Sequence, residues 1–331
     1  MPNRIVVFSL LVLLSIPSPV RAGEGIGEQA ASVPPAKGLF QFEHDGRTRS
    51  YFLYLPSAAS RSQPLPLLLA LHGGGGSAKR WPAYTNGCFE RLAETQPFLL
   101  VYPEGVQGHW NDERDYPSSY AHRNEIDDLG FLTALIDYLV TAYPVDRNRV
   151  YVAGVSNGGM MTHYLAGRAS ERIAAIATVI ASLPEKFSGR LRPSAPVSVL
   201  MINGTKDPLV PWDGGMVKFG RRENGKVLSV DETVRFWVEQ NRCDTDPGVI
   251  ELPDLDPSDG TRVSKTTYGA GARHTEVVLY SVFEGGHTWP SHERKSGLLR
   301  KLLIDPLVGR QSGDIDACEV IWDFFKSHPR Q

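Results

Sequence analysis

The sequence has little net charge and, after its first residues, no long apolar run; each shortage excludes a class of function. Among 331 residues, 35 are lysine or arginine and 37 are aspartate or glutamate, so the formal net charge is −2. A charge so close to zero gives no electrostatic basis for binding nucleic acid. No segment beyond the N-terminus approaches the roughly 20 consecutive apolar residues that a membrane-spanning helix needs.

Cysteine is scarce as well. The chain has three, Cys88, Cys243 and Cys318, and none lies in a Cys-x-x-Cys pattern or at a metal-ligand spacing from histidine. The sequence therefore predicts no structural metal site. Three cysteines allow one disulfide and one free thiol, and the sequence leaves all three pairings open.

The one long apolar run lies at the N-terminus. Arg4 precedes the run Ile5–Ile16, and the segment Val20-Arg21-Ala22 ends in a small residue suited to cleavage. The run is too short for a membrane anchor and has the wrong flanks. The pattern therefore predicts a secretory signal peptide over residues 1–22, and a secreted protein, extracellular or periplasmic, that has no membrane segment once this peptide is removed.

The rest of the chain is predicted to be a flexible leader over residues 23–37 and a single folded domain over residues 38–331. No linker or internal repeat divides the second part. One helix is expected over residues 80–95, another begins at the capping box Ser229-x-x-Glu232, and residues 245–260 are expected to form a loop. Continuous apolar runs, such as 67–71 and 98–102, alternate with stretches of helical character. Such runs suit strands buried on both faces, so we expect an α/β fold with a mostly parallel central sheet covered by helices on both faces.

A serine stands in a turn between an apolar strand and a helix. The pattern Gly-x-Ser-x-Gly runs from Gly154 to Gly158, with Ser156 at its centre. Flanking glycines tolerate the strained turn that exposes a serine hydroxyl to a base. The motif predicts Ser156 as a nucleophile, although an ordinary strand-to-helix turn can carry the same pattern.

Four consecutive glycines, Gly73–Gly76, follow His72 at the end of a predicted core strand. The lysine and hydroxyl of a phosphate-binding loop are not at the required spacing. Open α/β sheets build their sites at the carboxyl ends of strands, which favours an oxyanion loop. We expect the backbone N–H groups of Gly74 and Asn157 to bind an oxyanion, and His72 to brace the loop by hydrogen bonding.

Two further reactive side chains follow later strands. The order Ser156, Asp207, His287, each in a loop after a strand, is the order of the catalytic triad in α/β-hydrolases. His287 would take the serine proton and pass it to the leaving group, while Asp207 would orient the imidazole. Asp213 and Asp231 compete for the acid role, but Asp207 lies closest to a strand end.

Other polar and aromatic residues have competing interpretations. Asp127 and Asp128 open a predicted helix, and we interpret them as helix-capping rather than catalytic carboxylates. Trp110, Trp212 and Trp289 lie in loops on the predicted site face. They are candidate substrate-binding residues that would stack on a sugar, a phenolic ring or a polymer, and the alternative is that they pack the loops.

Six motifs in order resemble one family. They are L-H-G-G-G-G-S-A, V-Y-P-E-G, D-D-L-G-F-L, R-V-Y-V-A-G-V-S-N-G-G-M-M, I-N-G-T-K-D-P-L-V-P-W-D-G-G and G-G-H-T-W-P. Together they resemble the polyhydroxybutyrate depolymerase-like esterases, a secreted family with feruloyl-esterase-like members, from about Arg49 to Phe325. Arg168 stands where many members carry a cysteine, which puts a familiar disulfide in doubt.

The resemblance implies an α/β-hydrolase fold, the triad Ser156, Asp207 and His287, and hydrolysis of carboxylic esters without a metal or organic cofactor. The predicted function is that of a secreted serine esterase. Its substrate would be a polyhydroxyalkanoate-type polyester or oligomer, or the feruloyl-type esters of plant cell walls. No appended polymer-binding module is recognisable, which favours soluble or oligomeric esters.

Two alternatives stay open at this point. The same triad can cleave amides, and a basic stretch could attract a polyanion such as polyaspartate, although such a stretch is usually a solvated face. The stretch comprises Lys218, Arg221, Arg222 and Lys226. The other alternative is a non-catalytic binding protein, since a hydrolase fold alone does not establish catalysis.

Overall fold

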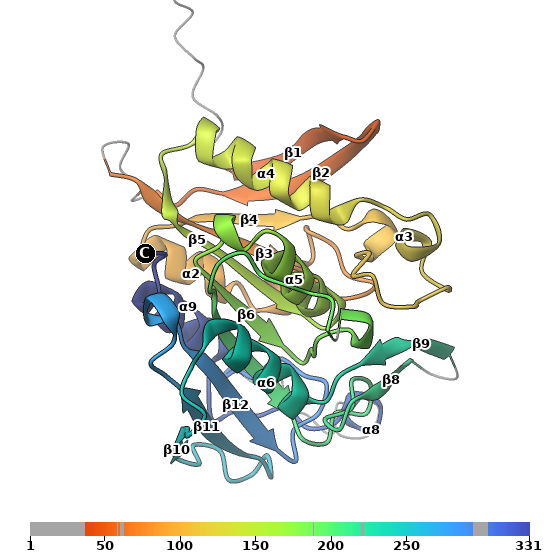
Figure 1. The fold of residues 1–331 in the computed structure, drawn as a ribbon, viewed down its shortest axis with the longest axis vertical. Coiled ribbons are helices and arrows are strands. Elements are labelled where there is room, and N and C mark those ends of the chain that lie inside the picture. Colours follow the sequence, from red (N-terminus) through yellow and green to blue (C-terminus); the bar gives the residue numbers. More distant parts are fainter. Residues whose placement is uncertain (1–36, 58, 60–62, 188, 220–221, 294–303) are drawn as a thin grey trace, which may run out of the picture. The chain divides into compact units, whose positions relative to one another are not determined.

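The computed structural model describes residues 37–331 apart from residues 58, 60–62, 188, 220–221 and 294–303 (Figure 1). The predicted signal peptide and the predicted leader up to residue 36 lie outside the described residues. Within the described part of the chain, no helix is both long enough and apolar enough to cross a membrane.

A ten-stranded sheet forms the centre of the unit that spans Pro35–Gln331. Its order is β1-β2-β4-β3-β5-β6-β7-β12-β11-β10. Six neighbouring strands run parallel: β4 (Leu99–Pro103), β3 (Leu65–Leu71), β5 (Val145–Val155), β6 (Ala175–Val179), β7 (Ser198–Gly204) and β12 (Val277–Phe283). Antiparallel strands complete the edges, with β1 (Lys37–His44) and β2 (Arg47–Tyr54) on one side and β11 (Arg262–Tyr268) and β10 (Gly248–Glu251) on the other. The predicted mostly parallel sheet is confirmed.

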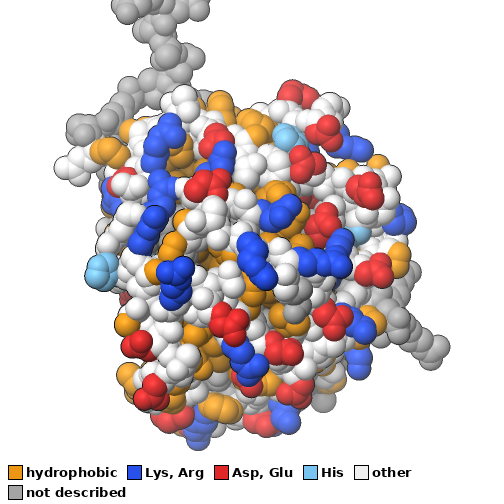
Figure 2. Space-filling model, viewed as in Figure 1, with side chains coloured by type: hydrophobic (Ala, Val, Ile, Leu, Met, Phe, Trp, Pro, Cys, Tyr) orange, Lys and Arg blue, Asp and Glu red, His pale blue; other side chains and the backbone are white. Residues whose placement is uncertain are grey.

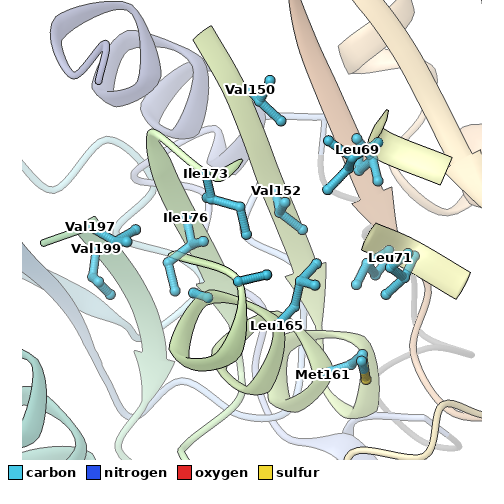
Figure 3. Packing of buried hydrophobic residues seen from close by; sticks show 14 of the residues in the cluster. Leu69, Leu71, Val150, Val152, Met161, Leu165, Ile173, Ile176, Val197 and Val199 are labelled. Carbon is cyan, nitrogen blue, oxygen red and sulfur yellow. The ribbon is translucent and has the colours of Figure 1, made fainter. Parts of the chain in front are cut away.

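Helices cover both faces of the sheet, as predicted. In Figure 1, α4 (Asp128–Ala142), α5 (Asn157–Arg168) and α6 (Val230–Asn241) lie on one face, and α2 (Cys88–Thr95) and α9 (Ala317–Ser327) lie on the other. Side chains of β3 alternate between the two resulting cores: Leu69 packs with the first set of helices and Leu68 with the second. Figure 3 shows Leu69, Val152 and Leu165 of α5 among the residues of the first core.

Several elements differ from the sequence expectation. The helix expected over residues 80–95 is two helices, α1 (Trp81–Tyr84) and α2, because Asn86 and Gly87 take positive φ angles of 54° and 68° between them. The hairpin of β8 (Gly215–Phe219) and β9 (Arg222–Val227) occupies a stretch without predicted structure, and β10 occupies part of a predicted loop.

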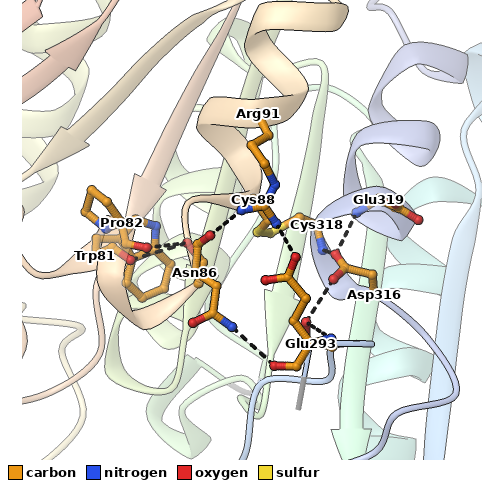
Figure 4. The surroundings of a disulfide bond; sticks show 11 residues. Trp81, Pro82, Asn86, Cys88, Arg91, Glu293, Asp316, Cys318 and Glu319 are labelled. Carbon is orange, nitrogen blue, oxygen red and sulfur yellow. Dashed lines mark hydrogen bonds and ion pairs between the residues drawn. A yellow bond between two sulfur atoms is a disulfide. The ribbon is translucent and has the colours of Figure 1, made fainter. Parts of the chain in front are cut away.

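A disulfide joins α2 to α9 (Figure 4). Cys88 and Cys318 are bonded, with their Cα atoms 6.1 Å apart, and Cys243 is a buried free thiol. The expectation of one disulfide and one free thiol is therefore confirmed, and the pairing that the sequence left open is 88–318. The bond covalently links two helices on the same face of the sheet, and the two cysteines are 230 residues apart in the sequence.

Candidate active site

The turn after β5 holds Ser156 in a strained conformation, with φ 52° and ψ −122°. Two of the surrounding glycines are required by packing. A Cβ atom added to Gly154 would lie 2.3 Å from the carbonyl oxygen of Gly158, and one added to Gly158 would lie 2.4 Å from the carbonyl oxygen of His72. The backbone of α5 thus sits directly against β5 and the end of β3, which fixes the serine at the sheet edge.

Hydrogen bonds connect Ser156, His287 and Asp207. The Nε2 atom of His287 lies 3.0 Å from Ser156 Oγ, and its Nδ1 atom lies 2.7 Å from Asp207 Oδ2. The other oxygen of Asp207 accepts hydrogen bonds from the backbone N–H groups of Leu209 and Val210, at 2.8 and 2.9 Å. A proton on Nδ1 leaves Nε2 free to accept the serine hydroxyl, the tautomer that a general base requires.

The sheet topology explains why these three side chains meet. Strands β5, β7 and β12 are parallel, so the loops that follow them emerge at one edge. The acid and histidine loops are also bonded to each other, since Lys206 N–H donates to the carbonyl of Gly285 at 2.9 Å. Asp213 and Asp231, the competing acids, are exposed and make no hydrogen bond to His287.

The glycine loop after β3 lies beside the serine. A Cβ atom on Gly73 would lie 3.5 Å from Ser156 Cβ, and one on Gly74 would lie 3.8 Å from Asn157 Cβ. Among the described residues, neither Gly74 N–H nor Asn157 N–H has a hydrogen-bond partner. Two unpaired donors beside a serine hydroxyl are what an oxyanion hole needs.

His72 braces this loop, as predicted. Its Nδ1 atom lies 2.8 Å from the carbonyl oxygen of Gly73, and its Nε2 atom accepts the N–H of Gly105 at 2.9 Å. Burial lowers the pKa of His72 to about 4, against the opposing effect of the Gly73 carbonyl. His72 is therefore neutral at pH 7 and serves as a fixed hydrogen-bonding link between two loops.

The Asn157 side chain makes contacts that sequence reasoning missed. Its Oδ1 atom accepts the backbone N–H of Trp110 at 2.9 Å, and its Nδ2 atom donates to Trp110 O at 3.0 Å and to Asp112 Oδ2 at 2.7 Å. Asp112 also meets His122 Nε2 at 3.0 Å and Arg114 Nε at 3.3 Å. Burial alone would raise the pKa of Asp112, but Arg114 and His122 outweigh burial, and the pKa is lowered.

The three candidate substrate-binding tryptophans do not share a surface. Trp110 is 0% exposed and donates through Nε1 to the carbonyl of His72, so the prediction that it stacks on substrate is wrong. Trp289 is 6% exposed and packs edge-on against the ring of Trp81, which likewise covers it. Trp212 is partly exposed and remains a candidate.

The paired carboxylates at the start of α4 divide between two roles. Asp127 accepts the N–H of Gly130 at 2.8 Å and caps the helix, as interpreted. Asp128 lies in the first turn of α4, where its charge favours the helix dipole as interpreted, but it does not cap the helix: it is buried, pairs with Arg49 and accepts the N–H of Asn111 at 2.7 Å. Burial raises the pKa of Asp128, and Arg49 offsets part of that rise.

The predicted basic stretch is only partly covered by the described residues. Arg221 lies outside the described residues, and Lys226 lines a hollow of about 580 Å³ between β8–β9 and two neighbouring loops. The charged residues of this hollow are of both signs: Arg114, Lys186, Arg190 and Lys226, with Asp115 and Glu185. Figure 2 likewise shows basic and acidic side chains interspersed over the face that it draws.

Comparisons with known proteins find esterases. The family described as Esterase PHB depolymerase matches residues 49–185. The putative esterase NocK of Nocardia uniformis subsp. tsuyamanensis is 34% identical over 253 residues, which cover 74% of this chain and 72% of NocK. Feruloyl esterase B of Piromyces equi is 24% identical over 201 residues, which cover 60% of this chain and 37% of that protein.

Solved structures share the fold. The acetyl xylan esterase from Aspergillus awamori superposes with a TM-score of 0.52 at 17% identity, covering 77% of this chain and 96% of that one. Native pOPH gives a TM-score of 0.51 at 14% identity, covering 91% of this chain and 90% of the other. At these identities the likeness establishes the architecture alone.

Proposed function

Since this chain belongs to the polyhydroxybutyrate depolymerase-like and feruloyl-esterase-like family of α/β-hydrolases, and is a carboxylic ester hydrolase, we propose that it works through an acyl-enzyme on Ser156. Ester hydrolase activity excludes the alternative of a non-catalytic binding protein. The observation that carries the proposal is the continuous hydrogen-bonded series from Ser156 Oγ through His287 to Asp207.

Proton transfer through His287 divides the reaction into two balanced halves. Ser156 Oγ attacks the ester carbonyl carbon while His287 Nε2 takes its proton, and the tetrahedral adduct collapses as His287 returns that proton to the leaving alcohol oxygen. Water then attacks the acyl-enzyme in the same manner, which releases the carboxylic acid and restores the hydroxyl. Asp207 stays ionised and stabilises the imidazolium that forms in each half.

The backbone N–H groups of Gly74 and Asn157 would donate to the oxyanion of each tetrahedral adduct. Their lack of another partner supports this assignment. Removing one oxyanion donor from a serine hydrolase typically costs about 3 kcal/mol of transition-state stabilisation. Every step is completed by side chains and backbone groups of the chain, so the mechanism calls for no metal or organic cofactor.

For the substrate we propose polyhydroxyalkanoate-type oligomers or feruloyl-type esters. The names of the matching family and relatives, which include feruloyl esterase B and the bifunctional acetylxylan esterase/xylanase XynS20E of Neocallimastix patriciarum, support this range. XynS20E is 31% identical over 171 residues, which cover 50% of this chain and 22% of that protein. Trp212 is the candidate aromatic contact for the acyl or sugar group.

We propose that the mature enzyme is exported, with one catalytic domain over residues 38–331. Two independent features support this location. The first 22 residues have the pattern of a signal peptide. The chain has a Cys88–Cys318 disulfide, and disulfides form and persist in the oxidising compartments where exported proteins reside.

A substrate panel tests the proposal. Purified mature protein is assayed with 3-hydroxybutyrate oligomers, methyl ferulate and p-nitrophenyl acetate, beside Ser156→Ala. We expect at least one ester to be hydrolysed and the variant to lose at least about a thousandfold in kcat while keeping its thermal unfolding temperature. A Ser156→Ala enzyme that retains activity would remove Ser156 from the mechanism.

A further inference from the structure

A fully buried carboxylate lies behind the serine turn and is not part of the proposed proton transfer. Asp112 is 0% exposed, and its two oxygens have separate partners. Oδ1 faces His122 Nε2 and Arg114 Nε, whereas Oδ2 receives the Nδ2 donor of Asn157 at 2.7 Å. A buried charge is costly unless it is paired, and here it is paired and also hydrogen-bonded to the residue that follows Ser156.

Both polar atoms of the Asn157 side chain are hydrogen-bonded, and both of its N–H donors are used. Its oxygen accepts from Trp110 N–H, and its two N–H bonds go to Trp110 O and to Asp112. The backbone N–H of the same residue is unpaired among the described residues. Because the side chain and the backbone nitrogen share one Cα atom, anchoring the side chain restrains φ of Asn157, and with it the direction of the N–H bond.

The same loop holds the second proposed donor. Trp110 Nε1 donates to His72 O at 2.9 Å, and the N–H of Gly75 donates to Gly108 O at 2.8 Å. His72 and Gly75 flank the pair Gly73-Gly74 in the sequence. Residues 105–112 therefore connect the segments that carry both proposed oxyanion donors.

The partners of Asp112 also reduce the repulsion between its carboxylate and the oxyanion. A bare carboxylate near a developing oxyanion would repel it. Arg114 and His122 both contact Oδ1, the oxygen that does not reach Asn157, and the Arg114 guanidinium compensates the negative charge. The lowered pKa of Asp112 keeps it ionised at neutral pH, so that it accepts rather than donates at Asn157.

We infer that Asp112 is a positioning residue, which acts through the Asn157 side chain to aim the Asn157 backbone N–H at the oxyanion. The inference rests on the proposed assignment of that N–H to the oxyanion hole. Asp112 touches no reacting atom, and its effect belongs to the transition state, where the oxyanion exists, rather than to binding of the planar ester.

The test compares two buried carboxylates that hold the same loop. Asp112→Asn keeps the size of the side chain but removes the charge behind Asn157. Asp128→Asn is the matched control, because Asp128 is buried and bonded to Asn111 N–H but has no contact with Asn157. We expect Asp112→Asn to lower kcat about 10- to 100-fold with KM within about twofold, and Asp128→Asn to keep kcat within about threefold even if it unfolds at lower temperature.

A boronic acid inhibitor gives a second readout, because it forms a tetrahedral anion on the serine and so reports the oxyanion hole directly. Across wild type, Asp112→Asn and Asn157→Ala, the loss of boronic acid affinity should parallel the loss of kcat/KM. Asn157→Ala keeps the backbone N–H and removes only the tether, so it tests the inference if Asp112→Asn does not fold.

Three results would overturn the inference: unchanged kcat in both variants, a rise in KM alone, or equal kcat losses in Asp112→Asn and Asp128→Asn that follow their unfolding temperatures. Failure of the proposed function looks different. In that case wild-type protein itself would neither hydrolyse p-nitrophenyl acetate nor bind the boronic acid.

Discussion

The positive φ of Ser156 stores backbone strain of roughly 1–3 kcal/mol, which the surrounding packing has to offset. Gly154 and Gly158 make that packing possible, since each lies where a Cβ atom would overlap a carbonyl oxygen. A precisely placed hydroxyl thus depends on residues that have no side chain. The conformation of Ser156 therefore depends on the close packing that Gly154 and Gly158 allow.

Gly158→Ala tests this dependence. The new methyl group would meet the carbonyl oxygens of His72 and Leu71 at 2.4 and 2.5 Å, so we expect a loss of about 1–3 kcal/mol in the free energy of unfolding, together with reduced kcat. Gly248→Ala is the control, because nothing lies within 4 Å of its added Cβ. Urea denaturation of both variants measures the difference, and equal stabilities would contradict the packing argument.

Two buried histidines make stability fall in mild acid. Burial lowers the pKa of His72 to about 4 and that of His163 to about 3, against 6.5 for an exposed histidine. The unfolded chain therefore binds more protons below pH 6.5, and stability present above that pH is lost as pH falls toward 4. Each histidine should contribute roughly 1.4 kcal/mol per pH unit within this window.

Urea denaturation between pH 7 and pH 4.5 checks this slope. His72→Gln keeps a donor and an acceptor but does not titrate. The two histidines together make the free energy of unfolding fall as the pH falls, and this variant should remove about half of their joint contribution. A His72→Gln slope equal to that of wild type would show that His72 is not held neutral in the folded protein.

At the scale of elements, the disulfide is the strongest link between distant segments. It joins α2 to α9 beneath the sheet, while the candidate site lies at the carboxyl ends of β5, β7 and β12. Closing a loop between residues 230 apart in the sequence restricts the unfolded chain more than closing a short one. The bond therefore contributes to the stability of the scaffold rather than to the chemistry.

Replacing both bonded cysteines, Cys88→Ser with Cys318→Ser, should lower the free energy of unfolding by about 2–5 kcal/mol, with kcat of the folded enzyme retained. Cys243→Ala is the comparison, because it removes a buried sulfur that forms no bond with another cysteine. Guanidinium denaturation of wild type, the double variant and Cys243→Ala measures their free energies of unfolding. A double variant as stable as Cys243→Ala would contradict the structural role of the bond.

The elements that the sequence predicted well are those with strong local signals. Solid apolar runs identify β3, β4 and β7, and the capping box at Ser229 and Glu232 marks the start of α6. The strand β11, with the sequence RVSKTTY, escaped prediction because it is polar and partly exposed. Asn86-Gly87 is a turn signal inside an otherwise helical stretch, and its positive φ angles break the expected helix.

The candidate site likewise contains some residues that the sequence predicts and others that it does not. Ser156, Asp207 and His287 could be predicted because each lies in the loop or turn that follows an apolar strand, and parallel strands bring such loops together. Asp112 could not, because its contact with Asn157 depends on how the long loop after β4 folds back onto α5. The same folding buries Trp110, whose position in a loop is compatible with either an exposed or a packed ring.

At the scale of the whole molecule, the net charge is small and the parallel sheet brings the candidate groups together. The net charge is −2, and the face in Figure 2 carries both basic and acidic side chains. The glycine loop, the serine turn, the acid loop and the histidine loop all follow parallel strands at one sheet edge. A single architecture thus brings together the proposed nucleophile, the proposed base and the proposed oxyanion donors.

The most direct test of the central claim, that Ser156 is the nucleophile activated by His287, is intact-protein mass spectrometry after treatment with a fluorophosphonate. We expect wild-type protein to gain one phosphonyl group, located on the peptide that contains Ser156, and to lose ester hydrolysis in the same proportion. His287→Ala should be labelled at least about 100-fold more slowly. Label on a different residue, or full hydrolysis by fully labelled protein, would contradict the account.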